Sequence, residues 1–271
     1  MKFGIFVHPK RPKVSVGQIA MQIQSAGLLY APKEPDVAIV VGGDGTFGYY
    51  GRILTIPMLF VGVKESDILG SRARLAETMY DSLDKALHNI GAGKYWIVEK
   101  RMLSVNLERQ DSDVLTDVYV ERGEFAGCIR YAMQVSNGRS SFNEYAIGNG
   151  VIVSTSYGSA GYFSYPNRLK SKKWDQGPST ARFSDNRMGI CHIIPTYLMR
   201  EKNGRRQVTN KIQYTVPIDC QIQINLVRDA NVRLYGTTQE SKGEEVLSND
   251  TISISASKNI AKIIKLRKND S

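Results

Sequence analysis

The 271-residue sequence lacks long apolar runs and has only three cysteines and three histidines. No stretch approaches the roughly 20 consecutive apolar residues of a membrane-spanning helix, and no secretion signal is visible. We therefore expect a cytoplasmic protein with no membrane partner. The cysteines, Cys128, Cys191 and Cys220, are odd in number and too widely spaced for a disulfide framework or a zinc site. We expect reduced core residues and no metal site built by protein side chains.

The chain is also short of acidic residues, with 26 Asp and Glu against 36 Lys and Arg and a net charge of +10. Such a surplus suits either nucleic acid or a small polyanion such as a nucleotide. The basic residues lie in short, dispersed runs without interleaved aromatic residues, and no nucleic-acid-binding motif is present. We therefore favour small-molecule nucleotides as partners and keep nucleic acid as the weaker alternative.

The first part of the chain alternates between strand and helix patterns, as an open α/β sheet does. Three apolar strands are predicted at residues 2–8, 36–42 and 57–63, with helices at 16–29 and 47–54. A further helix is expected within 73–95, where apolar residues recur at helical spacing and glycines follow as stop signals. These apolar residues are Leu75, Met79, Leu83, Ala86, Leu87 and Ile90. The pattern predicts an α/β domain with an open, mostly parallel sheet over residues 1–97.

From residue 98 the apolar residues alternate by twos, which is typical of strands with one buried face. The pattern recurs in "VLTDVYVERG", "GCIRYAMQVS", "CQIQINLV" and "TISISAS", with turn signals between the runs. We therefore expect an all-β domain over residues 98–255. The closing stretch, 256–271, contains the apolar run "IAKIIKLR", and we expect it to dock back on the first domain.

Three glycines and one carboxylate follow the second predicted strand, in "VGGDGT". Gly42, Gly43 and Gly45 allow unusual backbone angles and let a ligand approach N–H groups at a helix start, which together form a phosphate cradle. A carboxylate beside phosphates repels them unless it holds Mg²⁺ or takes a proton from an attacking hydroxyl. Asp44 is therefore the candidate catalytic residue. The alternative is a simple tight turn, since Asp and Gly are favoured turn residues.

Several stretches together resemble one enzyme family: "PDVAIVVGGDGTF", "LDKALHNIGAGKYWIVEKRMLSV", "LTDVYVERG", "GNGVIVSTSYGSAGY" and "ANVRLYG". In this order and spacing they are similar to the NAD kinases, which phosphorylate the adenosine ribose 2′-hydroxyl of NAD with ATP or, in some members, polyphosphate. "GGDGT" alone also occurs in lipid kinases and, in similar form, in phosphofructokinases, whereas "STxxGSxxY" narrows the resemblance.

The resemblance implies an α/β domain followed by a β-sandwich-like domain with the active cleft between them. It implies that Asp44 is catalytic and that Gly42, Gly43, Gly45 and Thr46 face phosphate. It further implies ATP and NAD as substrates, Mg²⁺ with the ATP, and a homodimer or homotetramer.

The resemblance also implies a set of nucleotide-binding residues in the β-rich domain. They are Thr116, Asp117, Asn149, Thr155, Tyr157, Gly158, Ala160 and Tyr162. Spacing and flanking residues match the family's Asn-acid motif to Thr116–Asp117, and Asn143–Glu144 then falls on the hairpin that follows.

Four of these positions depart from the family pattern. Thr116 replaces Asn, Asn149 replaces Asp, Tyr157 stands where a small hydroxyl residue is usual, and Ala160 lacks a hydroxyl. Residues for phosphate and proton chemistry are thus kept while residues for the dinucleotide are changed, and such changes can redirect specificity.

Three hypotheses follow for the function. The first is a divergent NAD kinase, the second a related kinase for another hydroxyl acceptor such as a nucleotide or lipid, and the third a nucleotide-binding homologue without catalysis. Retention of Asp44 argues against the third, because an anion binder gains nothing from a carboxylate in its cradle. His192, beside Cys191, could suggest a metal or a Cys–His pair, but adjacent strand residues point to opposite faces. We expect it to be a core histidine with its hydrogen bonds satisfied.

Overall fold

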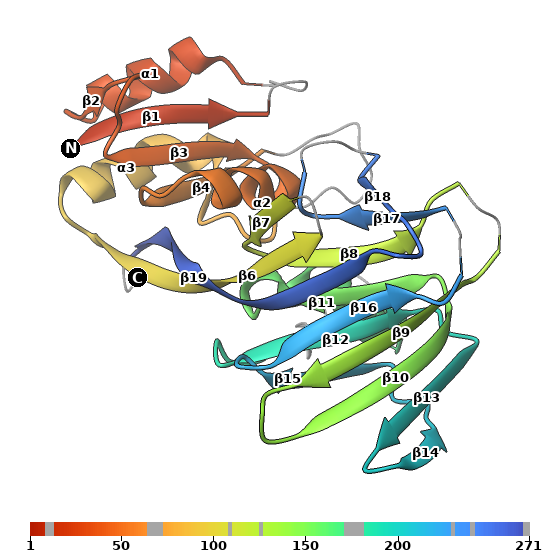
Figure 1. Ribbon diagram of the computed structural model, residues 1–271. Helices are drawn as coiled ribbons and strands as arrows, with labels where there is room; N and C mark the ends of the chain where they lie inside the picture. Colours follow the sequence, from red (N-terminus) through yellow and green to blue (C-terminus); the bar gives the residue numbers. More distant parts are fainter. Residues whose placement is uncertain are drawn as a thin grey trace. The chain divides into compact units, whose positions relative to one another are not determined.

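The computed structural model describes residues 1–8, 14–63, 73–107, 110–124, 127–170, 182–228, 231–238 and 242–267. Its contacts divide the chain into two compact units (Figure 1). Unit 1 comprises Met1–Lys100 with Ile260–Ser271, and unit 2 comprises Arg101–Asn259. No helix within the described ranges is long and apolar enough to cross a membrane.

Unit 1 is built on a parallel sheet in the order β2, β1, β3, β4, β19, with β5 beside β4. The strands are β1 (Lys2–Val7), β2 (Leu29–Tyr30), β3 (Val37–Gly42), β4 (Met58–Gly62), β5 (Thr78–Met79) and β19 (Thr251–Leu266). The helices are α1 (Val16–Ser25), α2 (Asp44–Ile53) and α3 (Leu83–Gly91), with the 3₁₀ turn η1 (Tyr80–Ser82) before α3. Strands β3 and β4 are almost wholly buried, as their continuous apolar runs require in a parallel sheet.

The end of the chain belongs to this sheet. Ile263 of β19 pairs in parallel with Met58 of β4, and Lys265 forms an ion pair of 2.6 Å with Glu77. Strand β19 runs without a break across residue 255, because its alternating pattern continues directly into the apolar run "IAKIIKLR".

The helix expected within 73–95 is shorter than its apolar spacing suggests. Helix α3 begins at Leu83, and Met79 lies in β5, where it pairs with Gly62 of β4. Leu75 precedes both elements, and its backbone N–H is donated to the Asp44 carboxylate at 2.9 Å rather than to a helical carbonyl. The prediction that Leu75 and Met79 belong to the helix is therefore wrong, because tertiary partners take their backbone groups.

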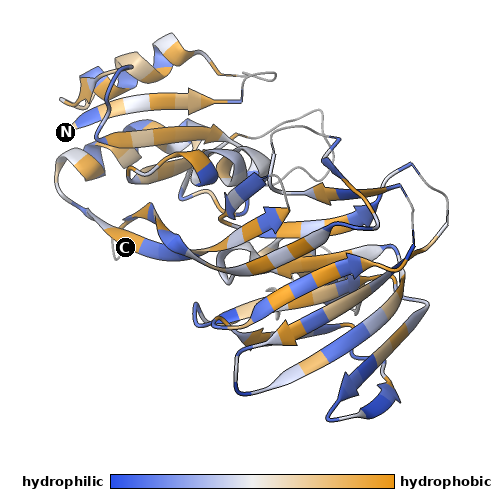
Figure 2. Ribbon diagram, in the orientation of Figure 1, coloured by the Kyte–Doolittle hydropathy of each residue, from blue (hydrophilic) through white to orange (hydrophobic). Residues whose placement is uncertain are grey.

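Unit 2 contains two antiparallel sheets whose inner faces share one core. One sheet has the order β14 (Arg205–Val208), β13 (Tyr197–Lys202), β10 (Ser141–Gly148), β9 (Ile129–Ser136), β16 (Gln221–Leu226) and β19. The other has the order β15 (Gln213–Pro217), β12 (Arg187–Ile193), β11 (Gly150–Ser154), β8 (Asp117–Arg122), β17 (Val232–Tyr235) and β18 (Glu244–Val246). Figure 2 shows hydrophilic and hydrophobic residues alternating along these strands. Tyr131, Val135 and Ile224 of the first sheet share a hydrophobic cluster with Val120 and Val153 of the second. This sandwich and the α/β unit confirm the expected fold class.

Two further strands, β6 (Tyr95–Leu107) and β7 (Gln110–Val114), pair with each other, and β6 also pairs with β19. Strand β6 begins in unit 1, because that unit extends to Lys100. After β11 come the 3₁₀ turns η2 (Tyr157–Ala160) and η3 (Tyr162–Ser164) and helix α4 (Tyr165–Lys170). Cys191 and Cys220 are buried, Cys128 is half-buried, and all three are free thiols.

Candidate active site

The glycine turn joins β3 directly to helix α2. Gly42 ends the strand, Gly43 is the N-cap of α2, and Asp44 is its first residue. A Cβ on Gly42 would lie 2.5 Å from the Thr46 hydroxyl oxygen, so the turn closes only around glycine. A Cβ on Gly43 or Gly45 would meet nothing within 4 Å, so the backbone at both positions faces open space. The first N–H groups of a helix lack a partner within the helix, so those of Asp44 and Gly45 suit an anion here. The Thr46 N–H instead donates to the Gly43 carbonyl at 2.9 Å.

Asp44 is half-buried, and its carboxylate is bound by a backbone group that lies outside helix α2. Its carboxylate Oδ1 accepts the backbone N–H of Leu75 at 2.9 Å. Burial raises the pKa of Asp44 above its ordinary value, while the N–H groups of Leu75 and Arg74 and the Arg74 charge partly oppose the rise. The result is a carboxylate that is fixed in position and more basic than a free aspartate.

The turn after β11 brings Thr116, Thr155 and Gly158 together through backbone contacts. The Thr155 hydroxyl lies 2.7 Å from the Leu115 carbonyl and 3.0 Å from that of Thr116, and it accepts the Gly158 N–H at 3.1 Å. A Cβ on Gly158 would lie 2.4 Å from the Thr116 carbonyl oxygen. Thr155 and Gly158 therefore shape the turn, since their own polar groups are already engaged.

Four other predicted residues of unit 2, Tyr157, Ala160, Tyr162 and Asn149, are half-buried. The carbonyl of Asn149 accepts the Arg122 N–H at 3.0 Å. The next residue, Gly150, has φ of +151°, and a Cβ there would lie 2.0 Å from the Val120 carbonyl oxygen. Only glycine therefore fits after Asn149.

A polar and aromatic cluster beside Tyr162 was missed by sequence reasoning. The Tyr162 hydroxyl donates to Glu121 Oε1 at 3.4 Å. The rings of Tyr162 and Tyr119 pack in a T-shaped arrangement with their centroids 5.3 Å apart. Tyr119 stacks on Tyr235 with ring centroids 5.0 Å apart. Burial raises the pKa of Glu121, with the Tyr162 hydrogen bond opposing the rise. The alternation of Asp117, Tyr119 and Glu121 along β8 was the available signal, because residues two apart share one face.

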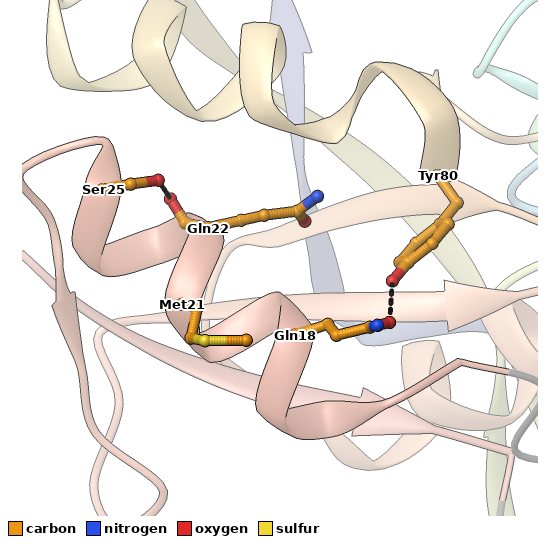
Figure 3. A pocket seen from close by; sticks show the side chains of 5 residues that line it. All are labelled: Gln18, Met21, Gln22, Ser25 and Tyr80. Atoms are coloured by element: carbon orange, nitrogen blue, oxygen red, sulfur yellow. Dashed lines mark hydrogen bonds between the residues drawn. The ribbon is translucent and has the colours of Figure 1, made fainter.

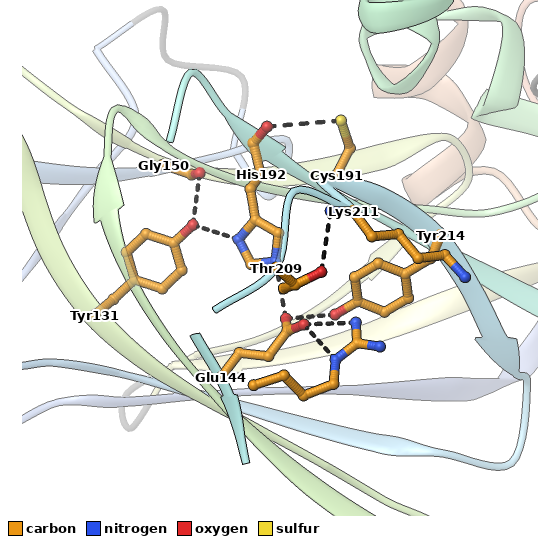
Figure 4. A network of polar contacts seen from close by, with 9 residues as sticks. Tyr131, Glu144, Gly150, Cys191, His192, Thr209, Lys211 and Tyr214 are labelled. Atoms are coloured by element: carbon orange, nitrogen blue, oxygen red, sulfur yellow. Dashed lines mark hydrogen bonds and ion pairs between the residues drawn. The ribbon is translucent and has the colours of Figure 1, made fainter. Parts of the chain in front are cut away.

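Asn143 and Glu144 lie on β10, and Glu144 is the centre of a buried polar network (Figure 4). Its Oε1 accepts two N–H groups of Arg200, at 2.9 and 2.6 Å, and its Oε2 lies 2.8 Å from His192 Nε2 and 2.5 Å from the Tyr214 hydroxyl. His192 Nδ1 lies 2.7 Å from the Tyr131 hydroxyl, which is 2.8 Å from the Gly150 carbonyl. Both ring nitrogens of His192 are thus occupied, and the Cys191 thiol donates to the His192 backbone carbonyl at 3.8 Å rather than to the imidazole ring.

A depression of about 470 Å³ lies on unit 1, lined by Gln18, Met21, Gln22, Ser25 and Tyr80 (Figure 3). The Tyr80 hydroxyl donates to Gln18 Oε1 at 3.2 Å, and the Ser25 hydroxyl donates to the Gln22 carbonyl at 3.0 Å. None of the described residues that line it is charged, so it has no group suited to phosphate chemistry.

Comparison with known proteins finds similarity to NAD kinases, in sequence and in fold. No protein-family model matches it. An NAD kinase of Geobacter sulfurreducens is 34% identical over 139 residues, which are 48% of this chain and 46% of that protein. The NAD kinase of Geobacter sp. strain M21 is 27% identical over 246 residues, which are 88% of this chain and 75% of that protein. The chain spans about half the length of the first curated relatives it matches.

Two solved structures share the fold over nearly the whole chain. Yeast NADH kinase complexed with NADH has a TM-score of 0.67 at 13% identity, with 100% of this chain and 84% of that one covered. An NAD kinase from Archaeoglobus fulgidus in complex with ATP has a TM-score of 0.64 at 17% identity, with 98% of this chain and 94% of that one covered. The chain is thus similar to NAD kinases in sequence, and it shares the fold of these two structures.

The similarity to these solved structures confirms the expected fold class. The glycine turn lies in unit 1 and the "STSYGSAGY" turn in unit 2. Within the described part of the chain, no three His, Cys, Asp or Glu side chains gather as a metal cage. A single carboxylate at the turn, Asp44, suits a Mg²⁺ ion held mainly by substrate phosphates, because Mg²⁺ in such sites is bound through one or two carboxylates plus phosphates.

Proposed function

We propose that the protein transfers the terminal phosphate of ATP to the adenosine ribose 2′-hydroxyl of NAD, giving NADP. The observation that carries the proposal is Asp44, a half-buried carboxylate in a glycine turn whose open backbone suits phosphate. The names of the curated relatives, all NAD kinases, support the same substrate and product.

Asp44 acts as the general base in this proposal. Its raised pKa favours proton uptake, because a base works best when its pKa approaches the working pH. The Leu75 N–H bound to its Oδ1 keeps the carboxylate in one orientation. Gly42, Gly43, Gly45 and Thr46 form the loop that holds the phosphates. When bound, Mg²⁺ neutralises charge on the transferred group.

Unit 2 supplies the dinucleotide contacts in this proposal, and its predicted residues take two roles. Asp117, Asn149, Tyr157, Ala160 and Tyr162 contact NAD, since each is half-buried and keeps part of its surface exposed. Thr116, Thr155 and Gly158 instead fix the backbone of that turn through the contacts between their own atoms. We further propose that the enzyme works in the cytoplasm as a homodimer or homotetramer.

The test is NADP formation from Mg²⁺-ATP and NAD by the wild type and by Asp44→Asn. Asn is nearly isosteric and can still accept the Leu75 N–H through its side-chain oxygen, so the fold should survive while the base is lost. Asp84→Asn is the matched control, because Asp84 is an exposed carboxylate in the first turn of α3. We expect Asp44→Asn to lose at least about 100-fold in kcat and Asp84→Asn to retain wild-type activity. Equal activity in all three proteins would contradict the role of Asp44.

A further inference from the structure

The β13–β14 hairpin forms a groove at the edge of its sheet in unit 2. The groove has a volume of about 560 Å³. Its lining residues are Arg200, Lys202, Asn203, Arg205, Gln207 and Thr209. None of the described lining residues is acidic, so three cations, two amides and a hydroxyl border one concave surface. The volume lies in the roughly 300–1,000 Å³ range of small-molecule sites.

The two faces of the hairpin carry different charges. Lys202 lies directly opposite Arg205 in the antiparallel register. Glu201 and Arg206 form the neighbouring pair, which points to the other face of the hairpin and makes an ion pair of 2.6 Å. Like charges directly opposite each other across two strands are destabilising. Within the described part of the chain neither Lys202 nor Arg205 has an ion-pair partner, so the repulsion on the groove face is not offset by the protein.

Arg200 gives the groove a fixed cationic wall. Two of its N–H groups bind Glu144 Oε1, and its guanidinium lies 4.7 Å from the Phe142 ring centroid and 4.5 Å from that of Tyr214. Its side chain is 28% exposed, and a guanidinium has five N–H donors. Arg200 can therefore present the remaining donors to a ligand without losing its orientation.

Thr209 adds a hydroxyl at the end of the groove. Its oxygen accepts the Lys211 N–H at 3.1 Å, which leaves its own hydrogen free to donate (Figure 4). Charged groups on an edge strand can serve simply to prevent pairing with another chain. That role needs charge, but it does not need the hairpin's one acid, Glu201, on the face opposite Lys202 and Arg205.

We propose that this groove binds a small multivalent phosphate anion. Arg200 contacts it through its planar guanidinium, and the anion supplies the negative charge that offsets the repulsion between Lys202 and Arg205. The concave shape favours a small anion over nucleic acid. The proposal uses no residue of the glycine turn and stands independently of the proposed kinase activity.

Calorimetric titration with tripolyphosphate tests the groove. Arg205→Ala and Arg206→Ala are matched variants, because they remove the same side chain from adjacent positions on opposite faces of one hairpin. We expect Arg205→Ala to weaken one binding event about tenfold or more and Arg206→Ala to leave that event nearly unchanged. Both variants should keep the wild-type circular dichroism spectrum and form NADP at the same rate as each other.

Three outcomes would overturn the proposal. One is the absence of any binding event that Arg205→Ala weakens. Another is equal weakening by the two variants, which would mean that only overall charge matters. The third is binding of a short DNA duplex through Arg205 without binding of tripolyphosphate. A protein that fails to make NADP but binds tripolyphosphate through Arg205 would contradict the kinase proposal alone.

Discussion

Removal of the Glu144 carboxylate should destabilise unit 2 far more than removal of any exposed acid. The Glu144 side chain is 0% exposed, and it accepts four hydrogen bonds from Arg200, His192 and Tyr214. Glu144→Ala leaves these groups without their acceptor inside the sandwich. Breaking a buried ion pair from one side costs about 3–5 kcal/mol, because the remaining charge stays desolvated.

Glu144→Gln should be milder. The amide oxygen can still accept from Arg200, while its NH₂ group replaces an acceptor next to the Tyr214 hydroxyl. We expect a loss of about 1–3 kcal/mol in the free energy of unfolding. The matched control is Glu201→Ala, which breaks the more exposed ion pair with Arg206 and should cost at most about 1 kcal/mol. Urea unfolding of the four proteins, followed by circular dichroism, measures the differences.

The pH dependence provides a second readout from the same proteins. Burial alone would raise the pKa of Glu144, but His192, Tyr214 and Arg200 outweigh it and leave the pKa below the ordinary 4.5. A depressed folded-state pKa contributes stability that is present above the unfolded pKa and is lost as the pH falls through the folded pKa. The stability gap between wild type and Glu144→Gln should therefore narrow as the pH falls below about 4.5. A Glu144→Ala loss no larger than that of Glu201→Ala, or a gap that widens in acid, would refute the reasoning.

Two further predictions concern the glycine turn. Gly42→Ala should abolish NADP formation, because the new Cβ would lie 2.5 Å from the Thr46 hydroxyl oxygen. The double variant Gly42→Ala/Thr46→Gly removes the clashing side chain and should recover part of the melting temperature that Gly42→Ala loses, because the φ of +159° and the new helix glycine still cost stability. Thermal melts followed by circular dichroism check this, and no recovery would contradict the clash as the cause. The rate of NADP formation should fall as the pH drops through the pKa of Asp44, because protonation removes the base. That pKa lies above 3.8, the ordinary value for an aspartate. A kcat/KM profile that stays flat from pH 7 down to pH 4 would contradict this assignment.

The glycine turn and the strand patterns were predictable because they depend on local chemistry. A buried apolar strand followed by Gly-Gly-Asp-Gly leaves few conformations for the chain, and the structure places Asp44 at the start of α2, directly after β3. The alternation by twos likewise predicted the β sandwich of unit 2, since each strand buries one face.

The polar network around Glu144 was not predictable, because its members are far apart in the chain. Glu144 meets His192, Arg200 and Tyr214 across 48, 56 and 70 residues. Sequence patterns reveal which face of a strand is apolar but not which polar residues meet inside the core. The same limit explains Leu75, whose spacing suggested a helix although its N–H is bound to Asp44.

The most direct test of the account is NADP formation from NAD and Mg²⁺-ATP by the purified wild type beside Asp44→Asn. The account predicts NADP from the wild type, and almost none from a variant that remains folded. No NADP from a wild type that binds ATP would contradict it, and so would equal turnover by the Asp44→Asn variant.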